Sequence, residues 1–236
     1  MKQLALDIAQ PPAPALDNFV PGRNAELVVA LYSLANGSGE RFIYVWGAPG
    51  SGRSHLLRAV LAAAQSDGRR VATFDPRAAQ ADPADDAWCA ADDVDGLDAG
   101  AQIALFNLHN RIRAGRGALL ASGNAPPSQL ALRADLVTRL ASGLVYQVHA
   151  LNEEEKVAAL RRHAQARGFQ LSQEVVAYLL RHARRDLPSL LALLDALDRY
   201  SLATRRAITL PLLRELLDVT AKKVATADEP RAIRPR

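Results

Sequence analysis

The chain has 236 residues, a formal net charge of +4 at pH 7, 49% hydrophobic residues and 23% charged residues. These proportions are ordinary for a globular protein and allow one large domain and a smaller one. The mild charge does not require a nucleic-acid partner, and no apolar run approaches the roughly 20 residues that cross a bilayer. The single cysteine, Cys89, excludes an internal disulfide. We therefore expect a cytoplasmic protein with no secretory signal and no membrane partner.

The first 21 residues are predicted to form an extended arm, because Pro11, Pro12, Pro14 and Pro21 disfavour a helix. After this arm, Asn24 is predicted to cap a helix over residues 25–34. Four residues rich in glycine, at positions 36–39, end that helix.

Strands and helices alternate between residues 42 and 148. Phe42–Trp46 is an uninterrupted aromatic and β-branched run, which is typical of a buried parallel strand. Further strands are predicted at Val71–Asp75, Ala87–Ala91, Ala118–Ser122 and Leu144–Val148, with helices at residues 55–62, Ala99–Ala114 and Arg133–Leu140. This order predicts an α/β domain whose parallel sheet lies between helices.

After residue 148 the pattern becomes helical. Asn152 begins a helix that ends near Gly168, Ser172 can cap a second helix through Ala183, and Asp186 can cap a third. A fourth helix starts near Pro211 and ends at about Lys222. We therefore expect four parts: an N-terminal arm, an α/β domain, a small all-helical domain and a disordered basic tail, at residues 1–21, 22–150, 151–222 and 223–236.

The turn after the first strand, Gly47-Ala48-Pro49-Gly50-Ser51-Gly52-Arg53-Ser54, has Walker A spacing with arginine in place of the usual lysine. Its glycines let backbone N–H groups turn toward a phosphate, and the following helix directs its positive end at the same anion. Because a guanidinium is bulkier than an ammonium, this loop favours binding of ADP or ATP over fast hydrolysis. The alternative is a Gly/Pro-rich connection with no ligand. The predicted nucleotide-binding residues here are Gly47, Pro49, Gly50, Ser51, Gly52, Arg53, Ser54 and His55.

A nucleotide site of this kind also needs a place for Mg²⁺. Ser54 is predicted to offer its hydroxyl to the ion, and a carboxylate at the end of a neighbouring strand holds it through water. The candidates are Asp92 and Asp93, after an alanine-rich strand, and Asp75, after a more hydrophobic one. Because residues 82–98 contain seven aspartates, a solvated acidic loop is a further alternative, and periodicity leaves this choice open.

The chain as a whole resembles the AAA+ ATPases. Within them it is similar to the replication-initiator family of DnaA, and in particular to the shorter Hda family, the regulatory inactivators of DnaA. The likeness runs from Gln3 to about Leu217. It rests on the stretches Tyr44–Gly47, Gly52–Leu57, Pro126–Leu130, Asp135–Leu140 and Leu194–Ser201, and arginine at position 53 is itself a feature of this subfamily.

The resemblance implies roles for several residues around the nucleotide. Asp92 takes the Walker B position with Asp93 beside it, so Mg²⁺ is expected between Ser54 and Asp92. Asn124 falls at the sensor 1 position, which meets the γ-phosphate region; the inactivators carry an acidic residue there, so this is a departure. Pro188 stands where a sensor 2 arginine is expected, which is a second departure.

Arg139 falls at the arginine-finger position of the family. The resemblance implies that it acts in trans, stabilising charge on the phosphates of ATP bound to a neighbouring subunit. The alternatives are an ordinary surface arginine or an ion pair with Asp135.

The N-terminal segment resembles the peptide by which such inactivators attach to the DNA polymerase sliding clamp. Leu4, Leu6 and Ile8 can present apolar groups to a pocket while Gln3 hydrogen-bonds beside them. An amphipathic edge strand or a frayed terminus is the alternative interpretation.

Together these features predict a negative regulator of DNA replication initiation. In this hypothesis the protein binds the clamp, reaches DNA only indirectly through it, and stimulates ATP hydrolysis by DnaA; we expect no DNA-binding domain after residue 222. One alternative is an autonomous ATPase that remodels DNA or loads a helicase, and another is an adaptor with a vestigial pocket. The sequence leaves open the oligomeric state, the resident nucleotide and hydrolysis in cis.

Overall fold

The computed structural model describes residues 13–75, 84–182 and 186–227. These residues belong to two compact units, one formed by Ala13–Asn152 and one that starts at Glu153. The predicted clamp-binding residues Gln3, Leu4, Leu6 and Ile8 lie outside the described residues, as does the tail after residue 227.

The described part of the first unit is built on a five-stranded parallel sheet with the strand order β2-β3-β4-β1-β5. In this register Tyr44 of β1 pairs with Ala121 of β4 on one side and with Val145 of β5 on the other. Because the strands are parallel, the segments that leave β1, β3 and β4 meet at one edge of the sheet. The strands are β1 Phe42–Trp46, β2 Val71–Thr73, β3 Trp88–Ala91, β4 Ala118–Gly123 and β5 Leu144–Gln147.

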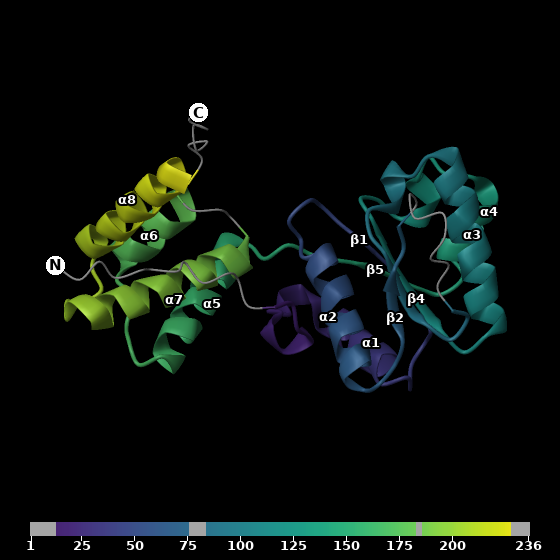
Figure 1. The fold of residues 1–236 in the computed structure, drawn as a ribbon, viewed down its shortest axis with the longest axis horizontal. Coiled ribbons are helices and arrows are strands. Elements are labelled where there is room, and N and C mark those ends of the chain that lie inside the picture. The colour runs from purple at the N-terminus through teal and green to yellow at the C-terminus, as the bar shows by residue number, and fades with distance from the viewer. Residues whose placement is uncertain (1–12, 76–83, 183–185, 228–236) are drawn as a thin grey trace, which may run out of the picture. The chain divides into compact units, whose positions relative to one another are not determined.

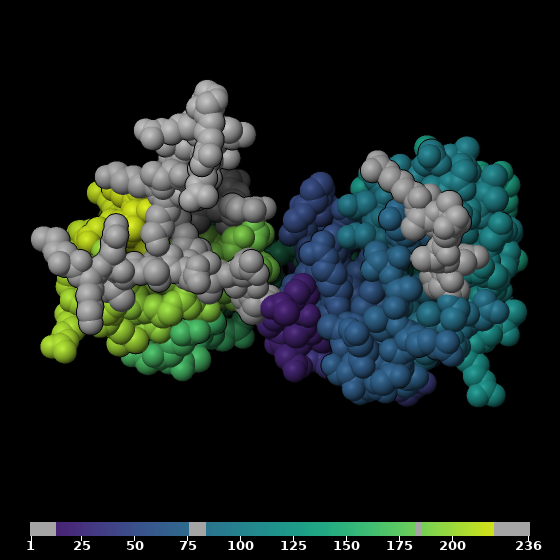
Figure 2. Space-filling model, in the orientation of Figure 1, coloured from purple at the N-terminus to yellow at the C-terminus, as the bar shows by residue number. Residues whose placement is uncertain are grey.

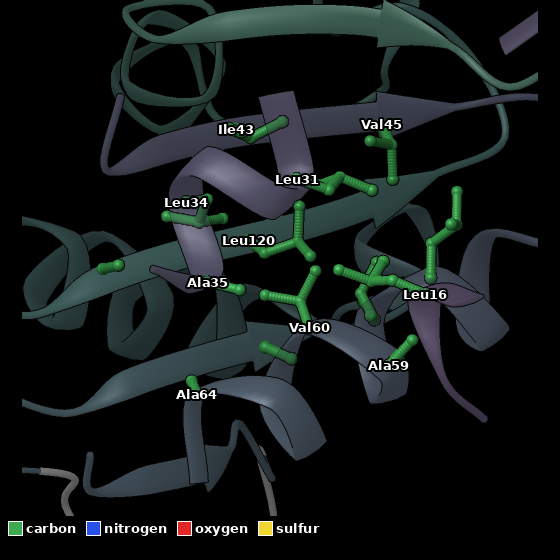
Figure 3. Packing of buried hydrophobic residues seen from close by; sticks show 14 of the residues in the cluster. Leu16, Leu31, Leu34, Ala35, Ile43, Val45, Ala59, Val60, Ala64 and Leu120 are labelled. Atoms are coloured by element: carbon green, nitrogen blue, oxygen red, sulfur yellow. The ribbon is translucent and has the colours of Figure 1, made fainter. Parts of the chain in front are cut away.

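Helices cover both faces of this sheet, which confirms the predicted α/β fold. Helices α1 (Ala25–Ala35) and α2 (Arg53–Ser66) lie on one face, and α3 (Ala99–Ala114) and α4 (Ala134–Leu140) lie on the other (Figure 1). Side chains alternate along β1 to fill both cores. Ile43 and Val45 pack toward α1 and α2, with Leu31, Val60 and Leu120 around them (Figure 3). The alternate residues Phe42 and Tyr44 pack on the other face, with α3 and α4.

Asn24 lies at the predicted N-cap position of α1, but its side chain does not bond to the first turn of the helix. Its side-chain amide donates to the carbonyl of His149 at 2.8 Å, and its side-chain oxygen accepts from the His149 N–H at 2.7 Å. The residue is 3% exposed, and it ties the start of α1 to the segment after β5. The predicted cap was wrong because a partner far along the chain takes both of its polar atoms.

The segment before α1 also differs from the extended arm that the prolines predicted. Leu16–Asn18 forms a short 3-10 helix, and the side chain of Leu16 is buried among the core residues of α2. The segment that begins at Ala13 lies against the surface of α2 in the space-filling view (Figure 2). Further 3-10 turns that the sequence did not predict are Gly22–Asn24, Val94–Gly96 and Pro127–Gln129.

The second unit is helical in its described residues. Its helices are α5 Glu153–Ala166, α6 Gln173–His182, α7 Leu187–Thr204 and α8 Leu210–Ala227. As predicted, the Asp186 carboxylate caps α7 by accepting from the Ser189 N–H at 3.0 Å. Helix α8 continues past Lys222, where the sequence predicted its end. Among the described helices of the chain, none has the length and apolar character needed to cross a membrane.

His109 on α3 is a buried polar residue whose protonation affects stability. It is 2% exposed, and neither ring nitrogen has a hydrogen-bond partner within the described residues. Its ring packs on Phe42 with 4.5 Å between centroids. Burial, followed by the charges of Arg139 and Arg113, lowers the pKa of His109 from 6.5 to about 4.

We therefore expect the unit of residues 13–152 to lose stability as the pH falls below 6.5. The unfolded chain takes up a proton on His109 below that pH, whereas the folded chain does so only near pH 4. The loss between pH 7 and pH 5 is about 2 kcal/mol in the free energy of unfolding. His109→Leu removes this component. Denaturant unfolding at each pH, followed by the fluorescence of Trp46 and Trp88 in this unit, measures the free energy of unfolding. If this free energy depends on pH equally in wild type and variant, His109 is not the cause.

Candidate functional site

The loop between β1 and α2 has a backbone that only glycine adopts easily. Gly50 and Gly52 have φ angles of +77° and +104°, in the left-handed region. At Gly47 a Cβ atom would lie 2.4 Å from the carbonyl oxygen of Val148, so a side chain there is excluded. A Cβ at Gly50 meets nothing within 4 Å. The loop therefore bends tightly while it leaves open space beside Gly50.

Helix α2 presents its N-terminus to this loop. The helix begins at Arg53, and its first turn contains Ser54 and no acidic residue. The first N–H groups of an α-helix have no partner within the helix and carry partial positive charge. The bend and the helix end thus offer an anion several aligned backbone donors, which is the geometry of a phosphate site.

Arg53 lies across the site toward the end of β3. Its Nη2 is 3.1 Å from Oδ1 of Asp93, and its side chain is only 11% exposed. The other terminal nitrogen, Nη1, is buried without a hydrogen-bond partner in the part of the chain that the structure describes, and so is the hydroxyl of Ser51. Buried donors without partners are costly, about 1–3 kcal/mol each. Both groups therefore fit a site that takes an anionic ligand.

Ser122 at the end of β4 joins the two aspartates that follow β3. Its hydroxyl donates to the Asp92 carboxylate and accepts from the Asp93 N–H at 3.1 Å, and the residue is fully buried. Partial removal from water raises the pKa of Asp93, Asp92 adds to this rise, and Arg53 opposes it. The backbone of Asp93 has a φ of +49°, which is uncommon for a residue with a side chain. Ser122 was not among the predicted site residues, although its place at the end of a strand beside the P-loop is a signal that could have identified it.

The strand order bears on the choice among the candidate Mg²⁺ ligands. Strand β3 pairs with β4, which pairs with β1, so Asp92 lies two strands from the P-loop strand. Asp75 follows β2, which is the outermost strand of the sheet and lies one strand farther from β1 than β3 does. Among the described residues, no cluster of three or more His, Cys, Asp and Glu side chains could hold a metal ion.

Asn124 follows β4 at the same edge as the P-loop. The carbonyl of the preceding Gly123 accepts from the Gly47 N–H at 3.3 Å, and the Asn124 N–H donates to Asp95 at 2.9 Å. Its side chain is exposed. The structure therefore brings Asn124 beside the start of the P-loop.

The ring of His55 contacts the N-terminal segment. Its Nε2 lies 3.2 Å from the carbonyl oxygen of Ala15, and its ring is 5.9 Å from that of Phe19, centroid to centroid. Burial lowers the pKa of His55. The Phe19 ring also closes on the loop, since a Cβ at Gly52 would lie 2.9 Å from it. The segment at residues 15–19 thus forms one wall of the site.

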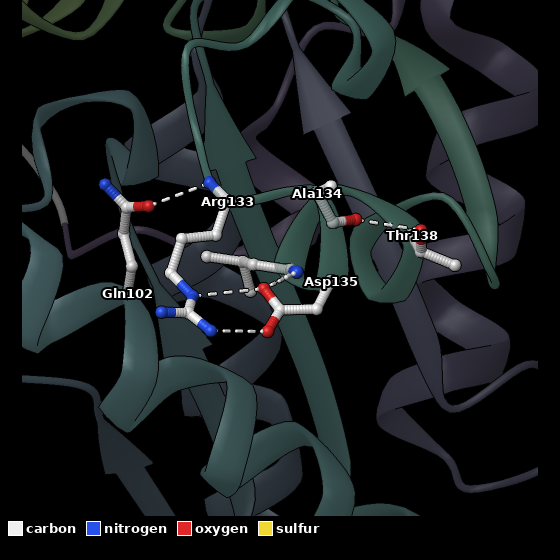
Figure 4. A network of polar contacts seen from close by, with 6 residues as sticks. Gln102, Arg133, Ala134, Asp135 and Thr138 are labelled. Carbon is white, nitrogen blue, oxygen red and sulfur yellow. Dashed lines mark hydrogen bonds and ion pairs between the residues drawn. The ribbon is translucent and has the colours of Figure 1, made fainter.

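Arg139 does not pair with Asp135, so that alternative from the sequence was wrong. Arg133 donates Nε and Nη2 to the two oxygens of Asp135, at 3.2 and 2.8 Å, and its own N–H donates to Gln102 (Figure 4). This bidentate contact lowers the pKa of Asp135. The half-buried Arg139 lies instead over the Phe106 ring, with Cζ 5.7 Å from the centroid.

Known proteins share both units of this structure. The family model of the Hda lid domain matches residues 153–217. Domain III of the replication initiation protein DnaA from Thermotoga maritima has a TM-score of 0.67 at 21% identity, over 88% of this chain and 96% of that chain. AMPPCP-bound DnaA from Aquifex aeolicus has a TM-score of 0.63 at 22% identity, over 78% of this chain and 65% of that chain.

A more distant similarity is to the RuvB branch migration motor of Thermotoga maritima, with a TM-score of 0.60 at 14% identity, over 87% of this chain and 72% of that chain. The chain thus shares its overall fold with these AAA+ structures. The chain is an AAA+ protein related to Hda and DnaA. This result confirms the family and the fold that the sequence predicted, and it identifies the second unit of this DnaA-related protein as the lid.

The geometry of this DnaA-related site predicts that Arg53 dominates anion binding. We expect Arg53→Ala to weaken ADP binding by 10-fold or more, because a charge-assisted hydrogen bond contributes about 1.5–3 kcal/mol. Asp93→Asn leaves binding unchanged or tightens it a few-fold, since it releases Arg53 from its ion pair. Calorimetric titration with ADP and Mg²⁺ measures both. Wild-type affinity in Arg53→Ala contradicts this role.

Proposed function

We propose that this protein is a negative regulator of replication initiation that stimulates ATP hydrolysis by DnaA while it is bound to the sliding clamp. In this proposal, Arg139 is an arginine finger that reaches the phosphates of ATP on DnaA. DNA is contacted only indirectly through the clamp, and the protein acts in the cytoplasm.

The observation that carries the proposal is the position of Arg139 relative to its own P-loop. Arg139 lies in the last turn of α4, a few residues before Leu144 enters the sheet as β5. Leu144 pairs with Ile43, near the start of β1, whereas the P-loop leaves the opposite end of β1 after Trp46. Arg139 therefore lies toward the edge of the sheet away from its own P-loop. This position supports a role in trans, on a nucleotide that another molecule holds.

The P-loop of the protein itself is proposed to hold ADP or ATP. Backbone N–H groups of residues 50–54 and the Arg53 guanidinium would bind the phosphates, and Ser54 and Asp92 would hold Mg²⁺, Asp92 through water. Bound Mg²⁺ neutralises phosphate charge. The guanidinium of Arg53 is bulkier than the ammonium of the usual lysine, and this difference supports weak hydrolysis in cis.

The trans role predicts that Arg139→Ala abolishes the stimulation of DnaA. An arginine finger contributes on the order of 10³-fold or more to hydrolysis, so turnover is expected to fall to the rate of DnaA alone. The assay follows ATP hydrolysis by DnaA with DNA-loaded clamp and each variant.

Arg133→Ala is the matched control. It also removes an arginine, at the start of the same helix, but this arginine is already paired with Asp135. Full stimulation is expected from it. Stimulation by Arg139→Ala equal to wild type overturns the proposed role. Rapid ATP hydrolysis by the protein alone, lost in Asp92→Ala, favours an autonomous ATPase instead.

The proposed clamp contact rests on the sequence of residues 3–8. A Gln3/Leu4 double alanine variant is expected to lose retention on immobilised clamp, since it removes the polar and one apolar contact of the peptide. A double alanine variant at the neighbouring positions Lys2 and Asp7 provides the control and is expected to bind. Retention of the Gln3/Leu4 variant at the wild-type level contradicts attachment through this peptide.

A further inference from the structure

A cavity lies at the edge of the sheet opposite the P-loop. It has a volume of about 510 Å³ and is formed where the chain enters several strands. Arg41 precedes β1, Arg70 precedes β2, Asp86 precedes β3 and Arg116 precedes β4. Because all strands of this sheet are parallel, their entry segments meet at this edge. The connections from α1 and at the end of α2 close the rest of the cavity.

The lining of this cavity is strongly basic. It contains four arginines, the three above and Arg69, and one acid, Asp86. Asp86 is engaged by Arg70, with 2.5 Å between its Oδ2 and Nη2. The nearby acid Asp85 faces Arg111 at 3.6 Å and does not line the cavity. The lining residues thus carry an excess of three positive charges.

Two of these arginines are held in place by contacts that use only some of their N–H donors. Arg69 stacks on Trp88, with Cζ 4.3 Å from the ring centroid, and its Nη2 donates to the Asn36 carbonyl at 2.8 Å. Its Nε is buried without a partner among the residues described. Arg41 uses a single nitrogen, Nη1, for the carbonyls of Gly115 and Gly117, at 3.0 and 2.9 Å. A guanidinium has five N–H donors, so both arginines retain donors for a ligand.

We propose that this cavity, which we call the arginine pocket, binds a multivalent phosphate anion. A single carboxylate would balance only one of the three excess charges, whereas a di- or triphosphate group carries enough charge and enough acceptor oxygens for several guanidinium forks. The stacked Arg69 is pre-ordered, which lowers the entropy that binding costs. The pocket is separate from the P-loop, so its ligand can be present with or without nucleotide there.

Calorimetric titration of the full chain with inorganic tripolyphosphate, in saturating ADP and Mg²⁺, tests this site. We expect Arg116→Ala, at an exposed position, to weaken binding 10-fold or more, and Arg69→Ala to do the same. Arg161→Ala is the matched control, because it removes the same charge from an exposed position on α5, in the other unit. It is expected to bind like wild type.

Three outcomes overturn the arginine pocket. Equal loss in Arg116→Ala and Arg161→Ala means that only general charge attracts the anion. Loss in Arg53→Ala but not in Arg116→Ala places tripolyphosphate at the P-loop. Equal affinity for citrate, a multivalent carboxylate, contradicts the selectivity for phosphate. Wild-type binding in Arg53→Ala, together with loss in Arg116→Ala, supports the pocket whether or not the proposed action on DnaA holds.

Discussion

The Arg53 guanidinium is the group on which the nucleotide site depends. It pairs with Asp93 and so connects the first residue of α2 with the segment after β3, across the loop that would hold phosphate. An ion pair with an exposed carboxylate contributes about 0–1 kcal/mol, and Asp93 is 63% exposed. The buried Nη1 beside it lacks a partner within the described residues and costs more than that pair provides. A phosphate can therefore compete successfully with Asp93 for this guanidinium.

The sheet determines where each chemical group can act. Strand β1 lies between β4 and β5 and is buried, so its two ends lie at fixed, opposite edges of the sheet. The P-loop, the aspartates after β3 and the end of β4 lie at one edge. Toward the other edge lie Arg139 and, among the strand entries, the arginine pocket. This arrangement supports the proposal that the protein holds one nucleotide while Arg139 acts on another.

Ser122 carries no charge itself, but it positions two charged residues. By bonding both the carboxylate of Asp92 and the backbone of Asp93, it fixes the two acids in different directions. Asp93 adopts a left-handed backbone there and turns its side chain to Arg53. The neighbouring acids therefore have different partners: Ser122 binds the carboxylate of Asp92, and Arg53 pairs with that of Asp93.

Local patterns in the sequence were enough to predict the α/β sheet, the P-loop turn and the lid helices. Phe42–Trp46 and Ala99–Ala114 were predicted with their observed bounds, because a buried strand and a long helix each have a strong period and clear breakers. Asn24 was misread because its partner, His149, lies 125 residues away. The alternative of an Arg139–Asp135 ion pair was wrong for a different reason: Arg133, only two residues from Asp135, binds both of its carboxylate oxygens.

The most direct test of this account is a crystal structure of the protein grown with ADP and Mg²⁺. The account predicts the β-phosphate against the amides of residues 50–54, with the Arg53 guanidinium turned from Asp93 to the phosphate and Nη1 hydrogen-bonded. An empty loop in saturating ADP, with Arg53 still 3.1 Å from Asp93, would contradict it.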